Sequence, residues 1–302
     1  MSYKEITINS VDGYRLDLHL FETPEPKAVI KFIHGMEEHQ GRYTPFAEFL
    51  QKHGYTVVTA DMRGHGEHAL TLSHIADRDG ARLLIEDEEA ALSRIRELFP
   101  DVPVFLFAHS MGTIIARKLL QTHSRDFAKV ALSGYPNPQS AARAGALLVS
   151  ALTAFKKPQG HSRLVDNMVL GGFSKAVKDA KTPLDWLSAD GKNVRRYAED
   201  PLCGVPFTLG SYAALFDLIN DIGKPDLYRR VNSDLPILLI AGREDPCVGG
   251  EKGRADSLDR LARAGFRNIR VETLDGMRHE ILNEEKRDMV YQKLLDYFDQ
   301  GT

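Results

Sequence analysis

The most informative stretch of the chain is Phe105-Leu106-Phe107-Ala108-His109-Ser110-Met111-Gly112-Thr113-Ile114-Ile115. An apolar run typical of a β-strand ends at Ala108, and a segment typical of a helix begins by Thr113. Ser110 therefore lies at the turn between them, in the layout of a nucleophile elbow, G-x-S-x-G, with Ala108 in place of the first glycine. A sharp, strained turn of this kind projects the serine hydroxyl above the sheet and aims a helix N-terminus at the reaction centre.

The four-letter pattern alone is common by chance, and its position between a strand and a helix is what makes it informative. Small residues are required two positions before and two positions after the serine, where larger side chains would collide with neighbouring elements. Gly112 meets this requirement, and Ala108 is small enough to be tolerated. Ser110 is therefore a candidate nucleophile.

The rest of the chain alternates between strand-like and helix-like segments. Near the start, isoleucines and leucines alternate with polar residues on either side of a turn at residues 11–13, which predicts an antiparallel hairpin. We then expect strands at residues 28–33, 55–60, 102–108, 129–133, 236–241 and 269–274. We expect helices at residues 45–53, 84–99, 113–122 and 256–264, and a final helix capped by Asn283. This alternation predicts an α/β fold with a mostly parallel central sheet and helices on both faces.

Residues 137–232 interrupt the alternation. Helical pieces rich in Ala, Leu and Phe, such as residues 144–155 and 212–219, replace the strands until residue 236. We therefore expect residues 1–136 and 233–302 to form a core domain, and residues 137–232 to form a helical cap, or lid, inserted above the carboxyl edge of the sheet. The apolar patches of this segment could line a substrate pocket, rest against lipid, or only pack the insertion onto the core.

Composition describes an ordinary globular protein. The chain has 302 residues, is 43% hydrophobic and carries a net charge of −3, so its charge balance does not favour a nucleic-acid partner. No apolar run approaches the length of a membrane span, and because residues 1–5 start no apolar stretch we expect no signal peptide. Cys203 and Cys247 are the only cysteines, which we interpret as buried free thiols. We therefore expect a cytoplasmic protein with no integral membrane segment.

A serine hydroxyl becomes a nucleophile only when a base accepts its proton and an acid orients that base. Among the eleven histidines, His279 is the strongest candidate base, because it follows a late strand and precedes the last helix. Asp245 is the preferred acid, since it follows the strand expected at residues 236–241, and Glu244 is the competing carboxylate. Loops at the carboxyl ends of strands are where an open α/β sheet places its site.

An acyl-transfer site also needs backbone donors for the oxyanion. The elbow itself supplies the amide of Met111, and the loop after residues 28–33 supplies that of Met36, because Gly35 lets the backbone approach the substrate. Four histidines, His34, His39, His65 and His68, are candidate ligands for a zinc ion. Their spacing matches no helical H-x-x-x-H pair with a catalytic glutamate, so no metal site is predicted.

Five motifs spread along most of the chain resemble those of a known superfamily. They are His34-Gly-Met-Glu-Glu-His39-Gln-Gly-Arg42-Tyr43, Asp61-Met-Arg-Gly-His-Gly66, Ala108-His-Ser-Met-Gly112, Gly242-Arg-Glu-Asp-Pro246, and Gly276-Met-Arg-His-Glu280 with Asn283-Glu284. With them the sequence resembles the α/β-hydrolase superfamily, in the monoacylglycerol lipase and lysophospholipase-like branch that borders the S33 serine aminopeptidases. The resemblance implies Ser110 as nucleophile, Asp245 as acid, His279 as base, Met36 and Met111 as oxyanion donors, and a helical cap.

The function expected from the residues and the resemblance is that of a serine hydrolase without a metal or organic cofactor. It would cleave carboxylic esters of the monoacylglycerol or lysophospholipid type, or other small acyl esters, through an acyl-enzyme. The alternatives are a thioesterase, an aminopeptidase in which Glu199 and Asp200 of the cap hold the substrate's α-amine, and a non-catalytic ligand-binding protein. The expected partner is a small acyl ester, with weak peripheral lipid contact by the cap left open, as are acyl chain length, leaving group and oligomeric state.

Overall fold

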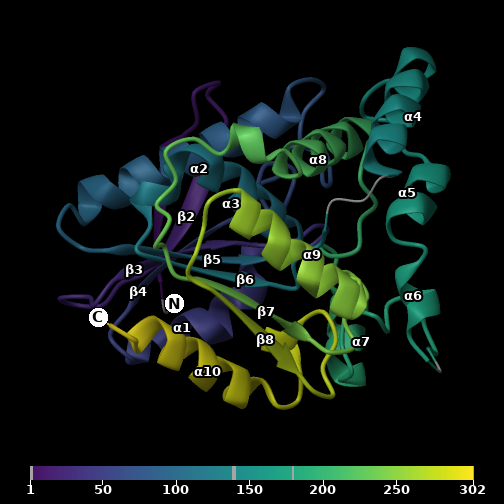
Figure 1. The fold of residues 1–302 in the computed structure, drawn as a ribbon. Helices are drawn as coiled ribbons and strands as arrows, with labels where there is room; N and C mark the ends of the chain where they lie inside the picture. Colours follow the sequence, from purple (N-terminus) through teal and green to yellow (C-terminus); the bar gives the residue numbers. More distant parts are fainter. Residues whose placement is uncertain (1–2, 138–140, 179, 302) are drawn as a thin grey trace.

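The computed structural model of the protein describes residues 3–137, 141–178 and 180–301. The described residues form an eight-stranded sheet in the order β1-β2-β4-β3-β5-β6-β7-β8 (Figure 1). The strands are β1 (Lys4–Asn9), β2 (Arg15–Phe21), β3 (Val29–Ile33), β4 (Thr56–Ala60), β5 (Val104–His109), β6 (Lys129–Ser133), β7 (Ile237–Gly242) and β8 (Ile269–Leu274).

The sheet is mostly parallel, as predicted. Only β1 with β2, and β2 with β4, pair antiparallel, and the other described pairs run parallel from β4 to β8. The predicted hairpin has the register Ile6↔Leu18 and Ile8↔Leu16, which places the alternating apolar residues opposite one another. Parallel strands end at the same edge of the sheet, so the loops after β3, β5, β7 and β8 lie at one edge.

Helices cover both faces of this sheet (Figure 1). One face carries α2 (Gly80–Leu98), α3 (Met111–His123) and α9 (Gly250–Arg263), and the other carries α1 (Thr44–Lys52) and α10 (Arg287–Asp299). Each face has its own buried apolar cluster. Covering both faces explains why every residue of β3 to β7 is buried, and why these strands read as continuous apolar runs.

The segment between β6 and β7 contains helices and no strand in its described residues. They are α4 (Ala141–Phe155), α5 (Arg163–Val169), α6 (Phe173–Ala176), α7 (Gly191–Glu199) and α8 (Leu209–Ile222). Helix α8 packs against α4 on one side and against α2 and α3 on the other, so it joins this segment to the core. Residues 138–140 and 179 of the predicted cap lie outside the described residues, and the limits 137–232 stay a prediction.

Three predicted helix starts are wrong, and the first of these helices, α2, begins at Gly80 rather than at residue 84. Asn283 does not cap the last helix: it ends a 3-10 turn, η4 (Ile281–Asn283), and α10 begins at Arg287. The chain is extended at Glu284, with φ of −70° and ψ of 161°, because the Glu284 carboxylate is buried and accepts several backbone amides there. Helix α9 begins at Gly250, six residues before the predicted Asp256, in a glycine-rich stretch with weak helical propensity.

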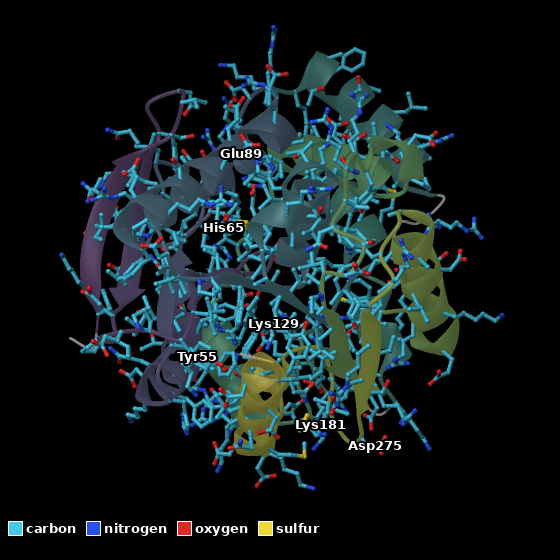
Figure 2. All side chains as sticks on the ribbon, turned by 60° about the vertical axis from the view of Figure 1, so that its left-hand side comes forward. Tyr55, His65, Glu89, Lys129, Lys181 and Asp275 are labelled. Carbon is cyan, nitrogen blue, oxygen red and sulfur yellow. The ribbon has the colours of Figure 1, made fainter. Side chains whose placement is uncertain are left out.

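The carboxyl end of α10 is fixed to the sheet by two side chains, Tyr55 and Lys129 (Figure 2). The hydroxyl of Tyr55 donates to Asp299 at 2.8 Å. The ammonium group of Lys129 donates to the carbonyl oxygens of Tyr297, Phe298 and Gln300. A cation at the last carbonyls of a helix is favourable, since those groups lack partners within the helix.

None of the described helices combines the length and the apolar character needed to cross a bilayer.

Candidate active site

The turn at Ser110 is sharp and depends on glycine at two nearby positions. Ser110 has φ of 51° and ψ of −121°, a backbone conformation that residues with a side chain rarely adopt. A Cβ on Gly112 would lie 2.4 Å from the carbonyl oxygen of Ile33, and a Cβ on Gly35 would lie 3.1 Å from the Cβ of Ser110. The loop after β3 therefore approaches the turn at Ser110 closely.

Three side chains from three loops form one hydrogen-bonded chain. Nε2 of His279 lies 2.8 Å from Oγ of Ser110, and Nδ1 of His279 lies 2.9 Å from Oδ2 of Asp245. Ser110 follows β5, Asp245 follows β7 and His279 follows β8, so each stands at the carboxyl end of its own strand. With Nδ1–H donating to the carboxylate, Nε2 is the ring nitrogen left to accept a proton from the serine.

The two adjacent carboxylates considered for the acid face different surroundings. Asp245 is buried, and its second oxygen accepts a hydrogen bond from the amide of Cys247 at 2.8 Å. The side chain of Glu244 is 55% exposed and lies 3.7 Å from the guanidinium group of Arg278. The structure thus brings Asp245, and not Glu244, to the histidine.

The pKa values of the two histidines nearest the serine are shifted in opposite directions. Burial is the largest single effect on His279 and lowers its pKa, but the negative charge of Asp245, the hydrogen bond to that carboxylate and the neighbouring Cys247 together outweigh burial, and the net pKa lies well above the ordinary value. The ring of His109 lies 4.6 Å from that of His279, and burial lowers its pKa to about 4. His109 is therefore a neutral neighbour, with Nδ1 3.3 Å from the hydroxyl of Ser133.

Met36 and Met111 lie beside Ser110 on the wall of the same pocket. Met111 is the first residue of α3, so its amide has no acceptor within the helix. Met36 follows Gly35, where an added Cβ would lie 3.1 Å from the Cβ of Ser110. The role of the two amides as oxyanion donors stays a prediction.

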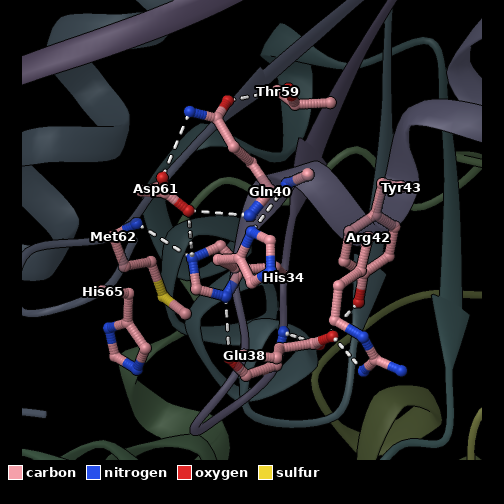
Figure 3. A network of polar contacts seen from close by, with 12 residues as sticks. His34, Glu38, Gln40, Arg42, Tyr43, Thr59, Asp61, Met62 and His65 are labelled. Carbon is pink, nitrogen blue, oxygen red and sulfur yellow. Dashed lines mark hydrogen bonds and ion pairs between the residues drawn. The ribbon is translucent and has the colours of Figure 1, made fainter. Parts of the chain in front are cut away.

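The loop that carries Met36 is held by His34 (Figure 3). Nδ1 of His34 lies 2.7 Å from the carbonyl oxygen of Gly35, and Nε2 accepts the amide of Met62 at 3.0 Å. Nearby, the carboxylate of Asp61 accepts the amide of Gln40 at 2.7 Å. These bonds connect the loop after β3 to the loop after β4, and they explain two of the sequence motifs as loop supports.

The four histidines considered for zinc do not gather in one place. His39 lies with Asp200 and Cys203, and His68 lies with Glu5 and Asp17. His34 is occupied by backbone groups, and Nδ1 of His65 lies 3.1 Å from the carbonyl oxygen of Arg63. Within the described residues, no set of three ligating side chains combines two of these histidines.

Ser110 and His279 line a mostly apolar pocket. Its empty space is about 1000 Å³ when the open mouth is included. Helices α3, α5, α6 and α8 and the loop before α7 supply most of its apolar wall. Representative lining residues are Ile114, Val169, Phe173, Trp186, Leu215 and Phe216. The ring of Trp186 lies 5.0 Å from the ring of His279, so the wall begins next to the candidate base. Such a pocket suits an acyl chain or another apolar group.

Sequence reasoning assigned no role to several polar residues next to this site. Arg42 and Glu280 belong to two of the quoted motifs, and the structure shows them as partners in a buried ion pair. Asn193 and Tyr197, on α7, contact the same pair. The two motif residues could have been suspected because each lies within a few residues of a candidate site residue, whereas nothing in the sequence distinguishes Asn193.

A protein-family model described as "Serine aminopeptidase, S33" matches residues 24–286 of the chain. The chain is 26% identical to a monoacylglycerol lipase of Mycolicibacterium smegmatis over 289 residues, covering 95% of this chain and 93% of that protein. It is 28% identical to the monoglyceride lipase of Rattus norvegicus over 226 residues, covering 73% of this chain and 66% of that protein.

The fold is shared with solved structures over almost its whole length. A thermostable carboxyl esterase from Bacillus coagulans, solved in complex with glycerol, superposes with a TM-score of 0.91 at 25% identity. The superposition covers 99% of this chain and 98% of that one. The helices between β6 and β7 are therefore part of the shared architecture.

Proposed function

The chain belongs to the serine aminopeptidase S33 family of α/β-hydrolases, in its monoglyceride-lipase-like branch, and we propose that it is a carboxylic-ester hydrolase. One observation carries the proposal: Ser110, at a strained turn, is hydrogen-bonded through His279 to the buried Asp245 and faces an apolar pocket. The names of the relatives, monoglyceride lipase, monoacylglycerol lipase and carboxyl esterase, support the same reaction class.

The proposed reaction proceeds through an acyl-enzyme. His279 accepts the proton of Ser110 as the hydroxyl oxygen attacks the ester carbonyl, and Asp245 stabilises the imidazolium that forms. His279 then gives that proton to the alkoxide leaving group as the bond from the carbonyl carbon to the ester oxygen breaks. A water molecule, deprotonated by the same histidine, attacks the acyl-enzyme; as the bond from the acyl carbon to Oγ breaks, His279 returns the proton to Ser110 and the carboxylic acid is released.

In the tetrahedral intermediates the former carbonyl oxygen carries a negative charge. We assign the amides of Met36 and Met111 as the donors that stabilise this charge. Donors fixed before the reaction cost no reorganisation as the charge develops, and losing one such donor costs about 2.7–4 kcal/mol. The hydrogen bonds that hold His34 on both sides support this assignment, because they fix the loop that bears Met36.

We further propose that residues 137–232 act as a cap over the site and that its apolar wall receives the acyl chain. Met168, Phe173 and Trp186 line the pocket from this segment. A pocket with apolar walls and a polar mouth fits a monoacylglycerol or a lysophospholipid, which combine one acyl chain with a polar headgroup. Medium-chain esters fit the same requirement.

An aminopeptidase is the main alternative within the family, and the surroundings of the carboxylates near the site favour the esterase proposal. Glu199 is exposed, Asp200 bonds to His39 at 2.9 Å, and neither is among the described residues that line the pocket. Of the carboxylates in the pocket wall, Glu38 and Glu280 are bound to Arg42. Burial, with the charge of Asp166, raises the pKa of Glu37 to about 8. A carboxyl group that holds its proton at neutral pH binds a free α-amine poorly.

A substrate panel tests the proposal. We expect turnover of p-nitrophenyl esters of increasing chain length and of a monoacylglycerol or a lysophospholipid, with little or no turnover of an aminoacyl anilide. A thioester with a matched acyl chain tests the thioesterase alternative. The Ser110→Ala variant should remain folded and lose activity on every substrate. No turnover of any ester by the wild-type protein would contradict the proposal and favour a non-catalytic ligand-binding protein.

A further inference from the structure

The described residues include one buried cluster of charges at the site that the proposed mechanism does not use. It consists of Glu38, Arg42 and Glu280, whose side chains are 4%, 10% and 4% exposed. We call it the Arg42 cluster. Burying three charges is costly unless each is paired and hydrogen-bonded, so its arrangement calls for a physical explanation.

The first carboxylate of the cluster is bonded to the loop that carries Met36. Oε1 of Glu38 accepts the amide of Gly35 at 2.5 Å and the hydroxyl of Tyr43 at 2.7 Å (Figure 3). Its Oε2 accepts Nη1 of Arg42 at 3.0 Å. Because Gly35 directly precedes Met36, Glu38 restrains the peptide next to one proposed oxyanion donor.

The second carboxylate belongs to the loop that carries the base. Glu280 directly follows His279, and both its oxygens accept the guanidinium group of Arg42, at 2.5 Å from Nη1 and 2.7 Å from Nη2. Two parallel bonds of this kind fix orientation as well as distance. One side chain, that of Arg42, therefore spans the loop of Met36 and the loop of His279.

Helix α7 packs against the cluster through two of its side chains. The amide nitrogen of Asn193 donates to Oε2 of Glu280 at 2.6 Å, and the ring of Tyr197 lies 4.9 Å from the guanidinium carbon of Arg42. The hydroxyl of Tyr197 also donates to the carbonyl oxygen of Glu37 at 2.8 Å, on the residue after Met36. The cluster is thus almost fully buried and contacts the segment proposed as the cap.

We propose that Arg42 is a positioning residue that sets the distance between the base His279 and the oxyanion donor Met36 through the two carboxylates it joins. This inference rests on the proposed function. Without the guanidinium group, Glu38 and Glu280 would be two like charges in a buried space, and they would separate or take up water or protons. In each case the bonds that fix the spacing of the two loops are lost, so the loops move relative to each other, whereas the apolar pocket wall is left in place.

The chain contains a matched control for this arginine. Arg63 is 3% exposed and binds both oxygens of Asp87, at 2.7 Å from Nε and 2.6 Å from Nη2. It also binds Asp12, and its guanidinium carbon lies 4.5 Å from the ring of Tyr14. Arg63 is thus a buried arginine with two acids and one aromatic ring, as Arg42 is, but it lines no part of the pocket.

The experiment compares Arg42→Lys and Arg42→Met with Arg63→Lys and Arg63→Met in ester hydrolysis and thermal unfolding. A shift of about 1 Å at a reacting centre can cost about 100-fold in rate, so we expect kcat of Arg42→Met to fall by about that factor while KM changes less than about threefold. Arg42→Lys should recover part of the loss, because it keeps the charge and loses the two-pronged geometry. The Arg63 variants should unfold at lower temperature yet keep kcat within about twofold.

The inference is overturned if the Arg42 variants keep kcat within about twofold of the wild type, or lose no more than Arg63 variants of equal stability. Should Arg42→Met fail to fold, Arg42→Lys decides the question alone by the same criterion. Ester turnover by the wild-type protein, lost in Ser110→Ala, tests the proposed function separately. A protein that is active but indifferent to residue 42 therefore contradicts only this inference.

Discussion

The backbone amide of Ser110 donates a hydrogen bond to the carbonyl oxygen of Ser133 at 2.9 Å. This bond extends the pairing of β5 with β6 one residue beyond the pair His109↔Ser133. The sheet therefore holds, by this hydrogen bond, the residue at which the chain turns, and helix α3 begins at the next residue. The strained backbone of Ser110 is thus fixed between the sheet and helix α3, and surrounding structure of this kind allows a strained turn to persist.

A glycine at residue 110 should relieve that strain. With φ of 51° and ψ of −121°, a residue with a side chain is disfavoured and glycine is not. We expect Ser110→Gly to be more stable than Ser110→Ala by about 1 kcal/mol, measured by urea unfolding. Both variants should lack ester hydrolysis. Equal stability of the two would mean that the backbone at this position is unstrained in solution.

The pH dependence of the reaction should report the pair of His279 and Asp245. The base must be neutral to accept a proton, so kcat/KM should rise with pH as His279 loses its proton. Because Asp245 raises the pKa of His279, the midpoint of this rise should lie above the ordinary histidine value of about 6.5. Asp245→Asn should move the midpoint to lower pH and reduce the plateau rate by about 10⁴-fold. An unmoved midpoint would exclude Asp245 as the partner.

Gly112 should not tolerate even a methyl group. A Cβ there would lie 2.4 Å from the carbonyl oxygen of Ile33, and backbone cannot move aside cheaply. We expect Gly112→Ala to cost about 1–3 kcal/mol of stability and to impair activity, since the loop of Met36 would be displaced. Gly191→Ala is the matched control in the first turn of α7, where the nearest side-chain atom would be 3.9 Å away. It should be neutral or stabilising.

Glu284 should be a major structural contact between the core and the segment before α7. Its buried carboxylate accepts the amides of Arg278, Ala189 and Asp190 and the hydroxyl of Ser188. Glu284→Ala leaves these donors without that acceptor, and we expect a loss of about 3 kcal/mol in chemical denaturation. The exposed neighbour provides the comparison: Glu285→Ala should change stability by less than about 0.5 kcal/mol. Similar losses for the two would show that the Glu284 bonds contribute little.

Much of the fold could be predicted because its signals are local. The apolar runs at β3, β5, β6 and β7 identify strands covered on both faces, and the resulting α/β class is confirmed by the sheet and by solved structures. The family resemblance is likewise confirmed. Ser110, Asp245 and His279 were proposed as site residues from their places after β5, β7 and β8, since the carboxyl ends of parallel strands converge on one edge. The structure brings the three side chains into hydrogen-bonding distance, and their catalytic roles stay a prediction.

What the sequence could not indicate depends on contacts between distant segments. The Arg42 cluster joins residues 38, 42 and 280, and residue 193 is bonded to it, but no local sequence pattern predicts these contacts. The start of α10 was misplaced for the same reason: Asn283 looks like a helix cap, but the buried bonds of Glu284 keep the chain extended there. Tertiary contacts of this kind override local propensity.

The central claim is that the oxygen of Ser110 is the nucleophile, activated by His279. The most direct measurement is the mass of the protein after reaction with a fluorophosphonate, followed by peptide mapping of the adduct. We predict a single adduct per chain on the peptide that contains Ser110, formed much more slowly in His279→Ala and absent in Ser110→Ala. An adduct on another residue, or labelling that is unchanged in Ser110→Ala, would contradict the account.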